Sequence, residues 1–339
     1  MARAAHVSVS TASSALSGTG RVAPDTRERV RRTAEVLGYQ PDQLARVVAK
    51  AERSELVAVV FDSLPDGPRK RDPKIFWEHA MYSISYELLR SQVSPILVPT
   101  VHHEHVRTLP IDVLLLITHD PGQLAHPIPI NPGTRIVVGG LAQEDAVGQV
   151  NDVAAWISID APAIMSECLD YLRSQGSSAP AFLATPQPLS PIAAYEKAAR
   201  DWFAHEGLPA HVEVGVPETE SATRRLLANG ADAIILLGDE NHPDIDGVLK
   251  AIEAAGMSCP DDVLVISLTE APRAPYVGPG ITTMYSDGFT AGVRTAELLL
   301  AGLRGQGYRS VTLDHQLDVR GSTSRTTAGR CGPSEPLRN

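Results

Sequence analysis

The stretch "VSVSTASSALSGTGRVAPDTRERV", residues 7–30, decides how the chain begins to fold. Small hydroxyl residues come first and arginines follow. Serine and threonine are indifferent helix formers, so helix stability alone does not explain a run of them. Residues 8–16 predict a short helix with Ala12, Ala15 and Leu16 turned inward, and the "GTG" at residues 18–20 ends it. The hydroxyl groups therefore suggest a second purpose.

A second helix is predicted over residues 26–37, "TRERVRRTAEVL", because Val30, Ala34 and Leu37 share one helical face and the charged residues fall elsewhere. Pro24 suits its first turn. Two short helices and a third, joined by tight turns, form a helix-turn-helix head. In such a head the second helix enters the major groove of DNA, where hydroxyl side chains near its start reach phosphates and base edges.

The charge is unevenly distributed along the 339 residues, which have a net charge of −10 and are 43% hydrophobic. The first 53 residues hold nine basic and five acidic side chains, so the remainder is strongly acidic. A basic segment of this kind attracts polyanions, although arginines on an amphipathic helix also make an ordinary solvated face. The length suits two or three globular domains.

Membrane insertion and secretion are not expected. The longest apolar runs, such as residues 113–117, are far shorter than the roughly 20 residues of a membrane span, and no continuous apolar stretch stands near residue 1. Cys168, Cys259 and Cys331 are odd in number and widely spaced, which argues against a disulfide framework and against a zinc site. We therefore expect a cytoplasmic protein.

From about residue 56, apolar runs alternate with helical patterns. The predicted strands are residues 56–61, 95–99, 113–117, 135–139, 156–159, 181–184, 212–216, 233–237 and 263–267, and the predicted helices between them include 161–175, 190–206 and 245–256. Alternation at this spacing predicts βαβ units, and hence an α/β body with two parallel sheets covered by helices on both faces.

Two stretches, "ARAAHVSVSTASSALSG" (residues 2–18) and "RVAPDTRERVRRTAEVLGYQPDQLARVV" (residues 21–48), resemble the lactose/galactose repressor (LacI/GalR) family. The spacing of Tyr39, Pro41, Ala45 and Arg46 is a hallmark of that family. The resemblance implies a small all-α helix-turn-helix head and two periplasmic-binding-protein-like (type I) lobes. It also suggests that "VRGST", residues 319–323, is the closing strand. The boundaries it implies are 1–40 for the head, 41–55 for a hinge helix and linker, 56–325 for the effector-binding and dimerisation body, and 326–339 for a flexible tail.

The resemblance also implies which residues contact DNA. Ser8 contacts phosphate, and Val9 and Ser10 read base edges. The supporting contacts are expected from Thr11, Ser13, Ser14, Arg27 and, in the hinge helix, Ala45 and Val48. Val48 stands where the family has a leucine that wedges into the minor groove, and the shorter valine predicts a weaker kink.

The head departs from the family in two ways. Relatives begin several residues earlier, so we expect the first helix to be truncated as written, with an upstream start and an imperfectly packed helix both left open. His6 replaces a turn glycine, at a position where a positive φ costs a non-glycine residue some energy.

The resemblance places an effector between the lobes. The effector-site residues it implies are Phe76, Trp77, Asp160, Tyr195, Asp239 and Thr269. Tyr195 and Thr269 stand where relatives have charged side chains that bond two adjacent hydroxyls of the ligand. Their presence makes a hexose a less favoured ligand than a less hydroxylated or partly aromatic molecule. Phe76 and Trp77 suit either stacking on a ring or a place in the core.

Other chemistry finds little support. The "HHEH" of residues 102–105 does not direct its histidines to one point, and "DENHPDIDG", residues 239–247, resembles a calcium loop but has Lys250 where a bidentate glutamate is required. Catalytic and nucleotide-binding motifs are missing, so we expect no enzyme, no cofactor and no metal. The leading hypothesis is a ligand-responsive repressor that binds a two-fold symmetric DNA operator as a homodimer. The alternative is a small-molecule binding protein of the same fold that does not use DNA.

Overall fold

A computed structural model describes residues 2–17, 22–36, 55–61, 75–99, 106, 108–118, 130–142, 153–186, 191–238, 244–269 and 273–325. The chain divides into two compact units, Met1–Glu55 and Leu56–Asn339. Several predicted features lie outside the described residues: the hinge helix at 41–49 with Ala45 and Val48, the "HHEH" run, Asp239 and the tail from residue 326.

The first unit contains α1 (Val9–Ser17) and α2 (Pro24–Val36), within two residues of the predicted helices. Ala12 and Ala15 of α1 and Val30 of α2 are buried against one another, as the helical periodicity predicts. Residues 2–6 form hydrogen-bonded turns before α1, and His6 has a φ of 52°. The left-handed conformation expected at this family glycine position is therefore present.

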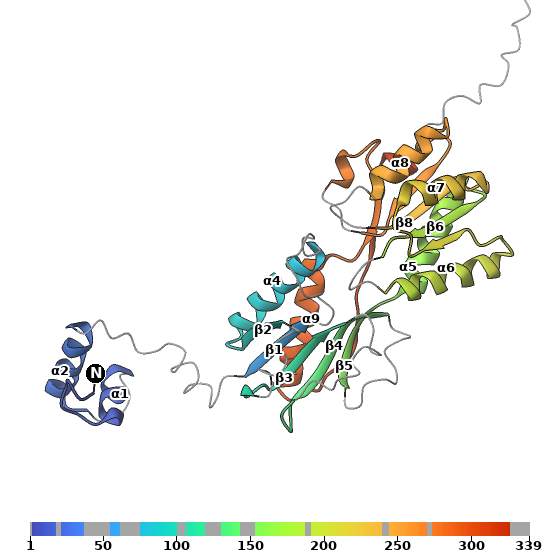
Figure 1. The fold of residues 1–339 in the computed structure, drawn as a ribbon. Coiled ribbons are helices and arrows are strands. Elements are labelled where there is room, and N and C mark those ends of the chain that lie inside the picture. Colours follow the sequence, from blue (N-terminus) through green and yellow to red (C-terminus); the bar gives the residue numbers. More distant parts are fainter. Residues whose placement is uncertain are drawn as a thin grey trace, which may run out of the picture. The chain divides into compact units, whose positions relative to one another are not determined.

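The second unit begins with a lobe, here called the N-lobe, whose sheet has the order β11-β5-β4-β3-β1-β2 and is parallel throughout. Its strands are β1 (Leu56–Phe61), β2 (Ser94–Pro99), β3 (Val113–Ile117), β4 (Arg135–Ala142), β5 (Val153–Ile159) and β11 (Val311–Thr312). Helices α4 (Ile75–Arg90) and α9 (Gly288–Leu303) pack together on one face of it (Figure 1). Strands β1 and β3 are buried along their whole length, which explains their continuous apolar sequence.

The second lobe, the C-lobe, has the sheet order β12-β10-β9-β8-β6-β7, and only the β12 pairing is antiparallel. Its strands are β6 (Pro180–Ala184), β7 (Val212–Val214), β8 (Ala233–Leu237), β9 (Leu264–Ser267), β10 (Thr282–Tyr285) and β12 (Gln316–Asp318), and its helices are α5 (Ala161–Ser174), α6 (Ile192–Glu206), α7 (Thr219–Ala228) and α8 (Asp244–Ala254). Phe182 packs with α5 and α6, whereas the next residue, Leu183, packs with α7 and α8. Figure 1 shows these two pairs of helices beside the strands of the C-lobe. Helices therefore cover both faces, as predicted.

The chain crosses between the lobes at short connections. Asp160 joins β5 to α5, Ser286 and Asp287 join β10 to α9, and residues 313–315 join β11 to β12. These connections, and the two parallel sheets, confirm the predicted α/β architecture. Among the described residues, no helix combines the length and apolar content that crossing a bilayer requires.

Several predicted strand bounds were wrong. Strand β5 begins at Val153 instead of residue 156, β4 ends at Ala142 instead of residue 139, and β10 and β11 were not predicted. Residues 319–323 were expected to form the closing strand. Instead, β12 ends at Asp318 and the 3-10 helix η4 (Gly321–Thr323) follows it. A second 3-10 helix, η3 (Ala274–Tyr276), lies between β9 and β10. The Ser322 hydroxyl donates to the Val265 carbonyl at 2.6 Å and accepts the Thr282 N–H at 2.8 Å, which holds the backbone out of the ladder. Strand β7 stops before residue 216, because Gly215 has a φ of 71°.

Candidate functional site

The amino-terminal end of α1 carries a cluster of hydroxyl groups. Ser8 precedes the helix, and its Oγ accepts the N–H of Thr11 at 3.0 Å, which caps α1. The same oxygen lies 2.9 Å from Ser10 Oγ and 2.7 Å from Thr11 Oγ1. Val9, among these hydroxyls, is 79% exposed. An exposed apolar side chain beside a capped helix start has no packing role in the head and is available to a partner.

The basic residues of the head lie on α2. The Arg29 Nε donates to the Ala5 carbonyl at 3.3 Å and so ties α2 to the first turns of the chain. Arg27, in the first turn of α2, is half-buried, whereas Arg31 and Arg32 are exposed. Of the residues predicted to contact DNA, Ser8 to Ser14 therefore lie at or in α1, and Arg27 lies on α2.

A cavity of about 140 Å³ lies between the N-lobe and the C-lobe. The N-lobe contributes α4, α9 and the ends of β3, β4 and β5, and the C-lobe contributes α5, α6 and the ends of β8 and β10. Parallel sheets bind ligands at the carboxyl ends of their strands. Apolar side chains form most of the wall, including Ile84, Ile117, Ile157, Ile164, Leu237 and Leu268.

Two aromatic residues form part of the N-lobe wall. The Trp77 ring lies between Phe61 and Phe76, with ring centroids 5.6 and 4.9 Å apart and interplanar angles of 89° and 84°. This edge-to-face arrangement is favourable and fixes the orientation of the rings. Phe76 and Trp77 also pack against the N-lobe core, which confirms the core role, whereas stacking on a ligand ring stays a prediction.

The polar groups on the cavity wall are hydroxyls, and they differ in how they are bonded. Thr269 Oγ1 lies 2.9 Å from Ser267 Oγ, and the Thr295 hydroxyl donates to the Ala291 carbonyl at 2.8 Å. Tyr195 is 8% exposed and Ser158 is 5% exposed. Burial raises the pKa of the Tyr195 hydroxyl, and the nearby Cys168 raises it further, so Tyr195 is neutral at physiological pH.

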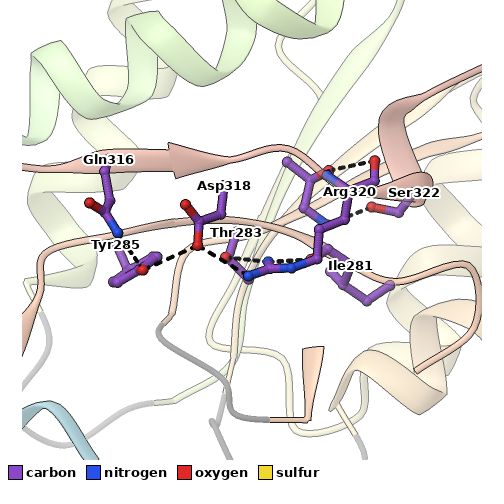
Figure 2. Close-up of polar contacts among 8 residues, drawn as sticks. Ile281, Thr283, Tyr285, Gln316, Asp318, Arg320 and Ser322 are labelled. Carbon is purple, nitrogen blue, oxygen red and sulfur yellow. Dashed lines mark hydrogen bonds and ion pairs between the residues drawn. The ribbon is translucent and has the colours of Figure 1, made fainter. Parts of the chain in front are cut away.

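A chain of polar contacts runs along β10 and β12 (Figure 2). Tyr285 is one of the residues that line the cavity, and its hydroxyl accepts a hydrogen bond from the Gln316 amide and donates to Asp318 Oδ2 at 3.2 Å. Arg320 Nη2 lies 3.1 Å from the same oxygen, and its Nη1 donates to Thr283 Oγ1 at 2.7 Å. The contacts therefore link a cavity residue to the strand pair whose continuations cross into the N-lobe.

The predicted effector residues are brought together only in part. Phe76, Trp77, Tyr195 and Thr269 all line the cavity. Asp160 is not among the lining residues, and its Oδ1 accepts the Ala163 N–H at 2.9 Å to cap α5.

Sequence reasoning missed Ser158 and Tyr285. Both stand at or next to the carboxyl end of a strand, Ser158 in the "WISI" run of residues 156–159 and Tyr285 at the end of β10. That position was the available signal, because ligands of parallel sheets bind at this edge.

A small helical head with an exposed hydroxyl-bearing helix start, in one chain with a two-lobed α/β body around a cavity, defines the class of ligand-responsive DNA-binding regulators. Residues 1–42 match the family described as "Bacterial regulatory proteins, lacI family", and residues 169–323 match the "Periplasmic binding protein-like domain". The chain belongs to the LacI family of transcriptional regulators.

Some relatives match along nearly the whole chain and another matches over a shorter stretch. The catabolite control protein A of Staphylococcus epidermidis is 20% identical over 95% of this chain and 98% of its own length. The lactose operon repressor of Rhizobium radiobacter is 32% identical over 98 residues, 29% of this chain and 84% of that protein. A solved Lac repressor dimer, bound to operator and the anti-inducer ONPF, is similar in fold with a TM-score of 0.71, at 18% identity over 95% of this chain and 97% of that one.

Proposed function

We propose that this protein is a repressor that binds a two-fold symmetric operator as a homodimer, and that a small molecule in the cavity controls that binding. One observation carries the proposal: a helix start with exposed Val9 and Ser10 and a cavity between two lobes occur in the same chain. The match of residues 1–42 to the lacI family of regulatory proteins and the similarity to the Rhizobium radiobacter lactose operon repressor over 98 residues support it.

In this proposal Val9 and Ser10 read base edges, since both lie exposed in the first turn of α1. Ser8 and Thr11 face phosphate, because the start of a helix attracts anions. Arg27 adds a contact to the DNA backbone. Ser13 and Ser14 on α1, and Ala45 and Val48 in the hinge, extend the interface as the sequence predicts.

A patch on the N-lobe supports a second copy of the chain as the partner. Its members, here called the aromatic face, are Tyr82, Tyr86 and Leu89 of α4, Leu97 of β2 and Phe289 of α9, and all five are exposed. The Tyr82 ring lies 6.2 Å from Phe289 and 6.4 Å from Tyr86, so the aromatic members form one cluster. Exposed aromatic patches mark interaction sites, and a two-fold interface uses the same patch on both subunits.

Control of DNA binding follows from the position of the cavity. A ligand that contacts both lobes favours the lobe arrangement that it fits best and shifts the population toward it. In a dimer that arrangement sets how the two heads are presented, so ligand and operator affinity are coupled reciprocally.

The direct test is selection of duplexes from a random pool by the full-length protein. A palindromic consensus is expected, with affinity for it falling steeply as salt rises, because phosphate contacts release counterions. Equal, weak binding to every duplex would contradict the proposal and favour a small-molecule binding protein that does not use DNA.

A further inference from the structure

The size of the cavity limits what it can hold. Its volume of about 140 Å³ is close to that of an apolar cavity of about 150 Å³ that accommodates benzene. The wall contributed by Phe76 and Trp77 and the isoleucine and leucine side chains around it match a ligand with an apolar ring. A hexose would place most of its hydroxyls against carbon.

Two buried residues of the wall have hydroxyl groups that bond no other group in the part of the chain that the structure describes. Tyr195 reaches the cavity from α6 of the C-lobe, and Ser158 reaches it from β5 of the N-lobe. The hydroxyls of Thr269 and Thr295, by contrast, are bonded within their own lobes. A hydroxyl without a protein partner can both donate and accept, so these two groups are available to bond a ligand.

The lining side chains in the described ranges carry no formal charge. Asp160, the acidic residue expected at this site, is engaged in capping α5. A charged ligand would lose its hydration here without gaining a counter-charge, which is strongly unfavourable. The raised pKa of Tyr195 reflects the same poorly solvated surroundings.

We propose that the effector is an uncharged molecule of about the size of a single ring, whose apolar body lies against Phe76 and Trp77 and whose one polar group bonds the Tyr195 hydroxyl, with Ser158 as the second polar anchor. The inference rests on the proposed function only in treating this cavity as the effector site.

The test measures binding of four probes to the full-length protein by titration calorimetry: toluene, benzyl alcohol, benzoate and glucose. Toluene and benzyl alcohol are expected to bind, with benzyl alcohol the tighter. Benzoate has the same ring with a charge, and glucose has hydroxyls without an apolar ring, so neither is expected to bind at the same concentrations.

The substitution Tyr195→Phe removes only the hydroxyl. It is expected to lower the affinity for benzyl alcohol about two- to tenfold, the range that one hydrogen bond contributes, and to change the affinity for toluene by less than about twofold. If the role of Tyr195 were purely structural, the substitution would lower the affinity for both probes equally. Tyr171→Phe is the matched control. Tyr171 lies in the same lobe but does not line the cavity, and its hydroxyl oxygen lies 3.0 Å from Thr323 Oγ1.

A cavity-filling variant locates the binding. Ala291→Leu adds three carbons to the wall and is expected to abolish toluene binding, whereas Ala204→Leu, at an exposed position of α6, leaves it unchanged. The Tyr195→Phe comparison decides the question even where Ala291→Leu does not fold.

Binding of benzoate or glucose in preference to benzyl alcohol overturns the proposal, as does failure of all four probes or an equal loss of both aromatic probes in Tyr195→Phe. The result is separable from the proposed function. A palindromic DNA consensus without aromatic-probe binding rejects the effector class alone, and probe binding without sequence-specific DNA binding rejects the repressor alone.

Discussion

Under the proposed function, the sequence preference of the head depends most directly on Val9. Its side chain is 79% exposed at the start of α1, so Val9→Ala is expected to change the stability of the head by less than about 0.5 kcal/mol. We expect Val9→Ala and Ser10→Ala to alter the consensus selected from a random duplex pool, because each removes a group that faces base edges.

The control is Arg27→Ala. It is expected to lower the affinity for all duplexes to a similar extent and to reduce the salt dependence of that affinity, as loss of a phosphate contact does. An unchanged consensus in both the Val9 and the Ser10 variant would show that α1 is not the reading helix.

Asp232 is expected to make the C-lobe sensitive to acid. Burial alone would raise the pKa of this carboxyl, but hydrogen bonds from the Ser177 hydroxyl and from the N–H groups of Ser178 (2.7 Å) and Ala179 (3.0 Å) hold it below its usual value. A carboxyl whose pKa is lowered by folding stabilises the fold at pH values above its pKa in the unfolded chain, about 4. This contribution is lost as the pH falls through the pKa of the folded state.

Asp232→Asn should therefore lower the free energy of unfolding by about 1–2 kcal/mol at pH 7, since the group is only partly buried. The difference from the wild type should shrink below about pH 4 in urea titrations at several pH values. Asp201→Asn is the control, because the exposed Lys197–Asp201 pair contributes little. A difference that stays constant with pH would exclude the assigned role.

At the scale of elements, the contact of α9 with α4 depends on small residues. A Cβ at Gly292 would overlap the backbone carbonyl oxygen of Ala80 and the side chain of Ser83, and one at Gly288 would overlap the Phe76 carbonyl. Gly292→Ala is expected to lower the free energy of unfolding by about 1–2 kcal/mol, because overpacking outweighs the gain in helix propensity of about 1 kcal/mol.

Chemical denaturation measures this change, and Gly292→Ser should be worse than Gly292→Ala because its side chain is larger. Toluene affinity should fall as well, because α4 carries Phe76, Trp77 and Ala80 of the cavity wall. A more stable Gly292→Ala protein would mean that helix propensity, rather than close packing, governs this position.

At the scale of the whole molecule, the aromatic face is expected to hold two copies together. Replacing Tyr86 and Leu89 with glutamate places four like charges in a two-fold interface and should give a monomer in sedimentation velocity. Operator affinity should then fall at least tenfold, since one head cannot contact both half-sites. Probe binding in the cavity should persist.

Tyr276→Glu serves as the control, because Tyr276 is 87% exposed on the C-lobe and lies outside the aromatic face. A dimer that survives the double substitution would place the interface elsewhere.

The sequence by itself determined most of the elements and their class. The continuous apolar runs of β1, β3 and β8 predicted buried parallel strands, and the spacing of Ala12, Ala15 and Val30 predicted the core of the head. These patterns are local: side-chain periodicity reports which face of a helix or strand is buried, whatever the partner is. The family signature around the head likewise lies within one short segment.

Only the tertiary structure decided what the cavity is made of. Ser158, Tyr195 and Trp77 lie far apart in sequence and meet because the chain passes from lobe to lobe and returns. Local sequence also could not tell that the Asp160 carboxylate caps α5 instead of lining the cavity, because both roles suit an aspartate at the end of a strand. Periodicity shows that a side chain is buried, whereas its bonding partner is set by neighbours that the fold brings from elsewhere in the chain.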